Sequence, residues 1–132
     1  MTVTTRIFLF LTMLVWLPYG LYCLLRPESL ADSAGVAFHS ATGATELRAM
    51  YGGLEAAIGA LAGVALLRAS LVRPALIAIG FLTAGLATGR LIGVALDGGF
   101  SSYTAMALGL EISSALIAFA LLPRSSPATA QT

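Results

Sequence analysis

The stretch AMYGGLEAAIGALAGVALL, residues 49–67, decides the fold class of this chain. Its 19 residues contain one charged side chain, Glu55. A helix rises about 1.5 Å per residue, so a helix of this length extends roughly 28 Å, close to the thickness of the hydrocarbon core of a bilayer. The stretch therefore predicts a helix that crosses a membrane with one carboxyl group inside it.

Three further stretches have the same apolar character. Residues 7–25 contain no charged side chain. Residues 74–96 contain only Arg90, and the last stretch contains only Glu111. Little of the chain remains for another folded unit, so we predict one all-α domain over residues 1–122. We expect an integral membrane four-helix bundle with spans at about 7–25, 49–67, 74–96 and 103–122.

The composition of the whole chain agrees with this fold class. Apolar residues make up 58% of the 132 residues and charged residues only 10%, whereas a soluble domain usually carries about 25% charged residues. Seven arginines and six acidic residues are too few to cover the surface of a soluble protein. The formal net charge of +1 gives no basic surface for nucleic acid. Composition thus excludes a soluble globule, a disordered chain and a nucleic-acid-binding protein.

The first connecting segment, residues 26–48, is long for a helical bundle. Pro27 and Glu28 are typical of a helix start, so we expect a short helix there, lying on the outer membrane surface. We expect Thr45 to cap the second span. The tail, residues 123–132, is predicted to be disordered.

The arginines indicate an orientation in the membrane. With both termini on one side, that side carries four arginines and the opposite side two. Because cytoplasmic segments are enriched in positive charge, both termini are predicted to be cytoplasmic. The two sets are Arg6, Arg68, Arg73 and Arg124 against Arg26 and Arg48.

Small residues recur at spacing four in the last three spans. Lipid tails compete with apolar side chains, so helices in membranes associate where small residues let their backbones approach. We expect these rows to pack within the chain, and packing against a second copy or another membrane protein is the alternative. The rows are Gly52, Ala56, Ala60 and Gly63; Gly85, Gly89 and Gly93; and Ala105, Gly109 and Ser113.

Three different spans place charges at similar depth. Glu55, Arg90 and Glu111 each lie roughly 9–12 Å from the outer ends of their spans, as judged by the helical rise. An ionised group at the centre of a membrane helix costs at least about 2.5–3.5 kcal/mol, so such groups face the bundle interior and find partners. We therefore predict that the three side chains meet. One arginine cannot neutralise two carboxylates, so one acid is left for protonation, another cation or a ligand.

Other polar residues extend this cluster. Arg48, Tyr51 and Glu55 are spaced as neighbours on one face of an α-helix. We predict an outward-opening ligand site. The alternative is that the charges form an ion pair that only fixes helix order, with Tyr51 as an interfacial anchor. The predicted binding residues are Glu46, Arg48, Tyr51, Glu55, Arg90, Asp97 and Glu111.

The sequence contains no arrangement of side chains that is typical of catalysis. No Ser/His/Asp or Cys/His motif is present, and Cys23 and His39 are single residues of their kind. We therefore predict no catalytic residue, no metal site and no cofactor. A metal held by Glu55, Glu111 and His39 is the alternative.

The run ELRAMYGG, residues 46–53, resembles the E-x-R-x-x-Y-G-G signature of a family of small bacterial four-span proteins, which is known as a domain of unknown function. Arg90, the pair at residues 97–98 and Glu111 also resemble the pattern of that family. The resemblance covers nearly the whole chain and implies a protein of the bacterial inner membrane. It implies no activity, cofactor or substrate.

Three functions are compatible with these features. The first is a binding protein for a small polar or amphiphilic ligand, such as a lipid or quinone headgroup, with Arg90 and Arg48 on an anionic or carbonyl group and the acids orienting them. The second is a structural or accessory subunit, which docks a membrane partner or a second copy through its small residues. The third is a proton or ion pathway, which is disfavoured because the inner halves of the spans carry no charge.

Overall fold

A computed structural model of the chain describes residues 1–122, and all of its regular elements in this range are helices. Four of the helical runs are long and apolar enough to cross a membrane. These observations confirm the predicted all-α class and the predicted number of long helices. The predicted disordered tail, residues 123–132, lies outside the described residues.

The first three helical runs are longer than the apolar stretches that predicted them, and the fourth is one residue shorter. The first is α1 (Val3–Leu25), and it is followed by the short α2 (Ser29–Ala34). The second run is continuous but changes its winding, from α3 (Ala41–Leu47) through the π-helical η1 (Arg48–Leu54) to α4 (Glu55–Leu67). The last elements are the 3₁₀ turn η2 (Ala69–Leu71), α5 (Val72–Asp97) and α6 (Ser102–Ala120).

The second long run begins earlier than predicted. The Ser40 hydroxyl accepts a hydrogen bond from the backbone N–H of Gly43 at 3.0 Å and so caps α3. The prediction that Thr45 caps this helix is wrong. Its hydroxyl donates to the carbonyl of Ala41 at 3.0 Å, because Thr45 lies inside a helix that starts one turn before it.

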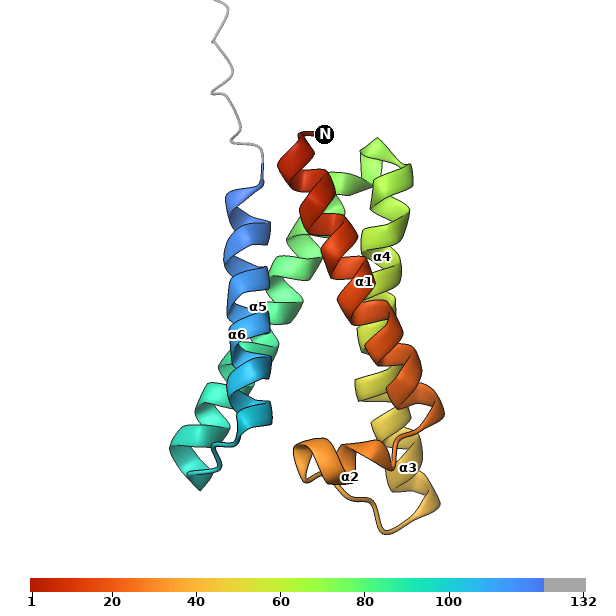
Figure 1. The fold of residues 1–132 in the computed structure, drawn as a ribbon, viewed down its shortest axis with the longest axis vertical. Coiled ribbons are helices and arrows are strands. Elements are labelled where there is room, and N and C mark those ends of the chain that lie inside the picture. Colours follow the sequence, from red (N-terminus) through yellow and green to blue (C-terminus); the bar gives the residue numbers. More distant parts are fainter. Residues whose placement is uncertain (123–132) are drawn as a thin grey trace, which may run out of the picture.

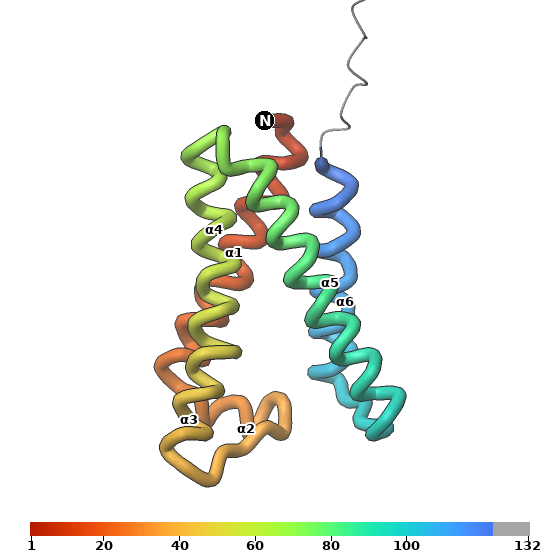
Figure 2. Tube along the Cα trace, turned by 180° about the vertical axis from the view of Figure 1, so that it is seen from behind, coloured from red at the N-terminus to blue at the C-terminus, as the bar shows by residue number. Residues whose placement is uncertain are grey.

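The long helices form two antiparallel pairs, α1 with the run α3–η1–α4, and α5 with α6 (Figure 1). The pairs converge at the end that holds the N-terminus and the last turn of α6, and they diverge toward the end that holds α2 (Figure 2). We call these the convergent and divergent ends. The apolar core fills the convergent end, with Phe8, Leu9, Ile58, Ala62, Ala65, Ala75, Leu76, Ile79 and Ala118.

Glycines bring α1 and the second run into backbone contact. A Cβ atom on Gly52 would lie 2.7 Å from the Cα atom of Leu24, and a Cβ atom on Gly59 would lie 2.7 Å from the Cα atom of Leu17. Gly20 on α1 has equally little space. For these glycines of the second span, the predicted close packing within the chain is confirmed.

The glycine row of the third span behaves differently. Within residues 1–122, a Cβ atom on Gly85, Gly89 or Gly93 would meet no atom within 4 Å, and the same is true of Gly109 on α6. The prediction that these rows pack within the chain is wrong for all four glycines. The reason is geometric, because the glycines lie toward the divergent end, and contact between α5 and α6 near the convergent end uses Gly80 instead.

The short helix α2 lies across the divergent end (Figure 1). Its Leu30 side chain is fully buried, and so is Pro27 just before it. α2 also contacts α6, so it links the two helix pairs where they are furthest apart. The predicted short helix in the first connecting segment is therefore present, and its place on a membrane surface stays a prediction.

Candidate functional site

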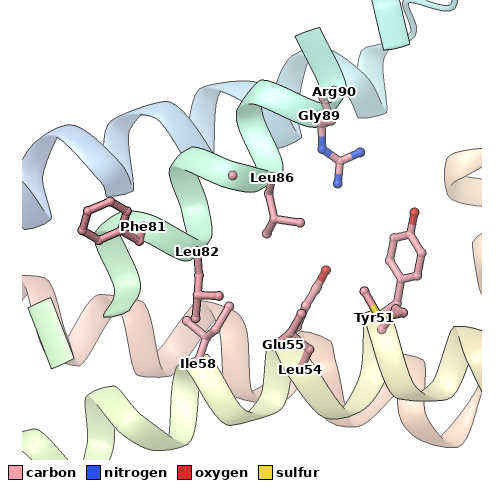
Figure 3. A pocket seen from close by; sticks show the side chains of 11 residues that line it. Tyr51, Leu54, Glu55, Ile58, Phe81, Leu82, Leu86, Gly89 and Arg90 are labelled. Atoms are coloured by element: carbon pink, nitrogen blue, oxygen red, sulfur yellow. The ribbon is translucent and has the colours of Figure 1, made fainter. Parts of the chain in front are cut away.

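Two of the cavities between the helix pairs share lining residues. The α4–α5 cavity has a volume of about 610 Å³ and is bounded by η1, α4 and α5 (Figure 3). The α1–α6 cavity has a volume of about 320 Å³ and is bounded mainly by α1 and α6. Glu55 and Arg90 line both cavities, so the two spaces share a charged wall.

Arg90 and Glu111 form an ion pair that joins α5 to α6. The Nε atom of Arg90 donates to Oε1 of Glu111 at 2.8 Å and to Oε2 at 3.1 Å. The side chains are 20% and 3% exposed, so the pair is largely removed from solvent. The guanidinium also lies 5.6 Å from the ring centroid of Tyr103, which is a cation–π distance. The arginine is therefore fixed in place by α6.

Glu55 is the acid that this ion pair leaves over. The residue is only 5% exposed, and within residues 1–122 its carboxyl group takes part in no hydrogen bond and no ion pair. Figure 3 shows the side chain pointing from α4 into the cavity, toward the helix that carries Arg90. An ionisable group that faces a cavity inside a membrane-spanning helix and has no protein partner is costly to retain, so it points to a function.

Hydrogen-bond donors without partners face or adjoin the same space. The terminal nitrogens of Arg90 make no hydrogen bond to other described residues, and they point into the α4–α5 cavity (Figure 3). The indole N–H of Trp16 is buried and has no partner in the described part of the chain. Trp16 lines the α1–α6 cavity beside Glu55. The site therefore offers both donors and acceptors to a ligand.

A pair of tyrosines links the helix pairs on the α1–α6 side. The hydroxyl groups of Tyr19 on α1 and Tyr103 on α6 lie 2.8 Å apart and share a hydrogen bond. Sequence reasoning missed Trp16, Tyr19 and Tyr103 as site residues, because aromatic residues are common in membrane helices and these lie on segments far apart in the chain.

Four of the seven predicted site residues gather at the cavities, namely Tyr51, Glu55, Arg90 and Glu111. Glu46 and Asp97 are exposed, Arg48 is half-buried, and none of these three lines either cavity.

The π-helical winding of η1 explains part of this result. The predicted common face of Arg48, Tyr51 and Glu55 assumed α-helical geometry, but this segment has π-helical hydrogen bonds from residue i to i+5. The angular step between residues therefore changes along η1, and the α-helical spacing rule does not apply there. Short π-helical segments frequently occur at functional sites.

The chemistry of the site is that of charge and hydrogen bonding. Within residues 1–122, no three side chains of His, Cys, Asp or Glu come together as ligands for a metal ion. His39, the third ligand of the alternative metal site, is exposed in the connection between α2 and α3. Glu55, Arg90 and their aromatic neighbours suit a ligand that carries polar groups of its own.

Comparison with known proteins places the chain in a family. No curated protein and no solved structure matches it. The sequence profile described as Domain of unknown function (DUF4345) matches residues 4–122, which is most of the 132-residue chain and includes all four long helices apart from the first residue of α1. The chain therefore belongs to the DUF4345 family, a family defined by its sequence and without an assigned function.

Proposed function

We propose that this chain is an integral membrane protein that binds a small polar or amphiphilic molecule in the charged cavity between its two helix pairs. Four helices of spanning length support the membrane assignment. The arginine distribution favours cytoplasmic termini, and the N-terminus lies at the same end as the last turn of α6. We propose a single four-helix domain in a bacterial inner membrane, with no catalytic residue.

The observation that carries this proposal is the state of Glu55. The residue is 5% exposed, and its carboxyl group points into the α4–α5 cavity and has no partner among the described residues. A carboxyl group that only stabilised the fold would be hydrogen-bonded or paired. A bound molecule with a hydrogen-bond donor would satisfy it.

Arg90 supplies the second contact. Glu111 occupies the Nε atom, so the terminal N–H groups remain available in a fixed orientation. A guanidinium held in this way binds phosphate, carboxylate or carbonyl oxygens through paired hydrogen bonds. A lipid or quinone headgroup therefore fits the site, and Tyr51 adds a hydroxyl from the η1 side of the same cavity.

The ion pair alone does not account for this arrangement. A charge pair that fixes the order of the helices requires Arg90 and Glu111, which already satisfy each other. It does not require Glu55. Glu55 is thus the residue whose replacement separates ligand binding from a purely structural role.

The test is native mass spectrometry of the protein purified in mild detergent, combined with the thermal shift on adding lipids and quinones. We expect the wild-type protein to carry a bound molecule and Glu55→Gln to lose it, with affinity reduced tenfold or more. Arg90→Lys is expected to weaken binding by a similar factor, because a lysine cannot form paired hydrogen bonds.

The matched control is Glu28→Gln, which changes an acid whose side chain is 60% exposed, near α2. This variant is expected to bind like the wild-type protein. The proposal is overturned if Glu55→Gln and Arg90→Lys fold normally, as judged by circular dichroism, and retain every co-purifying molecule.

The second candidate is a structural or accessory subunit of a membrane complex. The row Gly85, Gly89 and Gly93 favours it, because rows of small residues pack against partner helices and this one has no close neighbour within residues 1–122. Crosslinking that captures one stoichiometric partner along α5 would support this candidate. An ion pathway is a third, weaker candidate, because the apolar core fills the convergent end beyond the charged wall.

A further inference from the structure

We infer that the ligand is a membrane phospholipid that enters sideways between α4 and α5, with a head that carries an N–H or O–H donor beside its phosphate. This inference rests on the proposed function, and it adds the class of ligand, its orientation and its route. It replaces direct entry from the aqueous side with entry from the bilayer.

The α4–α5 cavity changes from polar to apolar along its length. Arg90 and Tyr51 lie at one end, and Phe81, Leu82 and Ile58 lie at the other (Figure 3). The polar end is nearer the divergent end of the molecule, where the helix ends and connecting segments lie. A phospholipid is likewise polar at one end and apolar at the other, so its head fits at Arg90 and its acyl chains fit toward Phe81.

The other two routes into the site are crossed by protein. At the divergent end, α2 reaches across and contacts α6. On the α1–α6 side, the hydrogen bond between Tyr19 and Tyr103 joins the two pairs. On the α4–α5 side, no side-chain hydrogen bond or ion pair joins η1 or α4 to α5 among the described residues. This side is therefore the one through which a molecule passes most easily.

Two glycines of α5 line the opening between α4 and α5, and neither is needed for close packing against another described helix. Gly85 and Gly89 line the cavity, and a Cβ atom on either would meet nothing within 4 Å. Glycine in a helix interior destabilises the helix relative to alanine. The absence of side chains at these two positions leaves room for an acyl chain along α5. The exposed Met50 and Phe81 at the rim provide apolar contacts with lipid.

The head is defined by the hydrogen-bonding groups it must satisfy. The terminal N–H groups of Arg90 need an acceptor, which a phosphate provides. The carboxyl group of Glu55 needs a donor, because it has no partner among the described residues. An ethanolamine ammonium or a glycerol hydroxyl beside the phosphate meets this need, whereas choline has no N–H or O–H donor and an oxidised quinone offers acceptors only.

The experiment compares lipid probes that differ from one another in the head group or in the presence of acyl chains. Lipid is titrated into detergent-solubilised protein, and binding is followed by the fluorescence of Trp16, the only tryptophan, which lines the α1–α6 cavity. The probes are dioleoyl phosphatidylethanolamine, phosphatidylglycerol and phosphatidylcholine, ubiquinone, and water-soluble glycerophosphoethanolamine, which has the head and no chains. The variants are Gly85→Leu, which fills the cavity wall, and Gly109→Leu, which adds the same side chain at an open position outside both cavities.

We expect phosphatidylethanolamine and phosphatidylglycerol to bind at least tenfold more tightly than phosphatidylcholine or ubiquinone. Gly85→Leu is expected to weaken the binding of these lipids tenfold and to leave glycerophosphoethanolamine unaffected, while Gly109→Leu binds like the wild-type protein. If Gly85→Leu does not fold, Gly85→Ala replaces it, with an expected threefold loss.

Wild-type affinity in a folded Gly85 variant overturns the lateral route, and equal binding of phosphatidylcholine or ubiquinone overturns the head assignment. In either case the proposed function stands if Glu55→Gln still abolishes binding. Failure of every probe to bind the wild-type protein, with no co-purifying molecule, overturns the proposed function itself.

Discussion

The two helix pairs contain similar glycine rows and use them in opposite ways. In the pair of α1 with η1 and α4, glycines touch the backbone of the facing helix, as Gly52 does at Leu24. In the pair of α5 with α6, Gly85 and Gly89 line a cavity, and a Cβ atom on either would meet no described atom within 4 Å. A row of small residues thus permits another helix to approach closely, but the row alone does not predict whether a helix of the same chain lies against it.

The pairs also differ in what joins their helices. The described part of the chain has no side-chain hydrogen bond or ion pair between α1 and the run α3–η1–α4, so that pair depends on close backbone contact. The α5–α6 pair has the ion pair between Arg90 and Glu111 and an edge-to-face contact of Phe81 with Phe119, whose ring centroids are 5.3 Å apart. One pair is joined by close backbone contact, and the other is joined by contacts between side chains.

The largest expected effect is at the close-packed pair. In Gly20→Ala, the new Cβ atom would lie 2.7 Å from the Cα atom of Ala56 and 2.8 Å from the carbonyl oxygen of Gly52, and neither backbone atom can move without separating the helices. We expect the free energy of unfolding to fall by about 3 kcal/mol or more. Unfolding by sodium dodecyl sulfate in mixed micelles, followed by circular dichroism, measures the loss.

The matched control is Gly93→Ala on α5, where the added Cβ atom meets nothing within 4 Å. The better helix propensity of alanine is expected to leave stability unchanged or to raise it by up to about 1 kcal/mol. Equal losses in the two variants would contradict the distinction between the helix pairs.

The second effect concerns the two buried acids. Glu111→Gln removes the charged partner of Arg90 and is expected to lower the free energy of unfolding by about 3 kcal/mol, because a partly buried guanidinium is left without its counter-charge. Glu55→Gln breaks no hydrogen bond or ion pair with the described residues, so its effect on the stability of the ligand-free protein is expected to stay below about 1 kcal/mol.

The same unfolding titration, run after lipid has been removed by detergent exchange, measures both acid variants. A loss in Glu55→Gln as large as that in Glu111→Gln would mean that Glu55 is paired within the folded protein. The reason for treating it as a ligand contact would then be lost.

The pairing of Arg90 with an acid of another span, and a position of Glu55 at the same cavities, could be predicted from the sequence because a charge in hydrocarbon is costly and the three residues have similar depths. Depth follows directly from the position of a residue in its helix. The sequence could not show which acid takes the arginine, because that choice depends on the rotation of each helix about its axis.

The remaining features depend on longer-range geometry. The divergence of the helix pairs follows from an apolar core at one end only, and an apolar span looks the same in sequence whether it faces core, lipid or cavity. Because η1 is π-helical, Arg48 does not lie on the common face with Tyr51 and Glu55 that α-helical spacing predicts. Tyr19 and Tyr103 are 84 positions apart, so no local pattern indicates that they meet.

The smallest expected effect is at this tyrosine bridge, the one side-chain hydrogen bond between the helix pairs in residues 1–122. Tyr19→Phe removes it, and hydrogen bonds between membrane helices contribute on average about 0.6 kcal/mol. That change corresponds to roughly a threefold shift in an opening equilibrium.

Cys23, the only cysteine, is buried one helical turn from Tyr19, so its rate of reaction with a membrane-permeant maleimide reports opening on this side. We expect the rate to rise about threefold in both Tyr19→Phe and Tyr103→Phe, because both remove the same bond. Tyr22→Phe, at an exposed tyrosine of α1, should leave it unchanged. A rise in only one of the two bridge variants would show that the hydroxyl groups act separately, and the α1–α6 side would then be as free to open as the α4–α5 side.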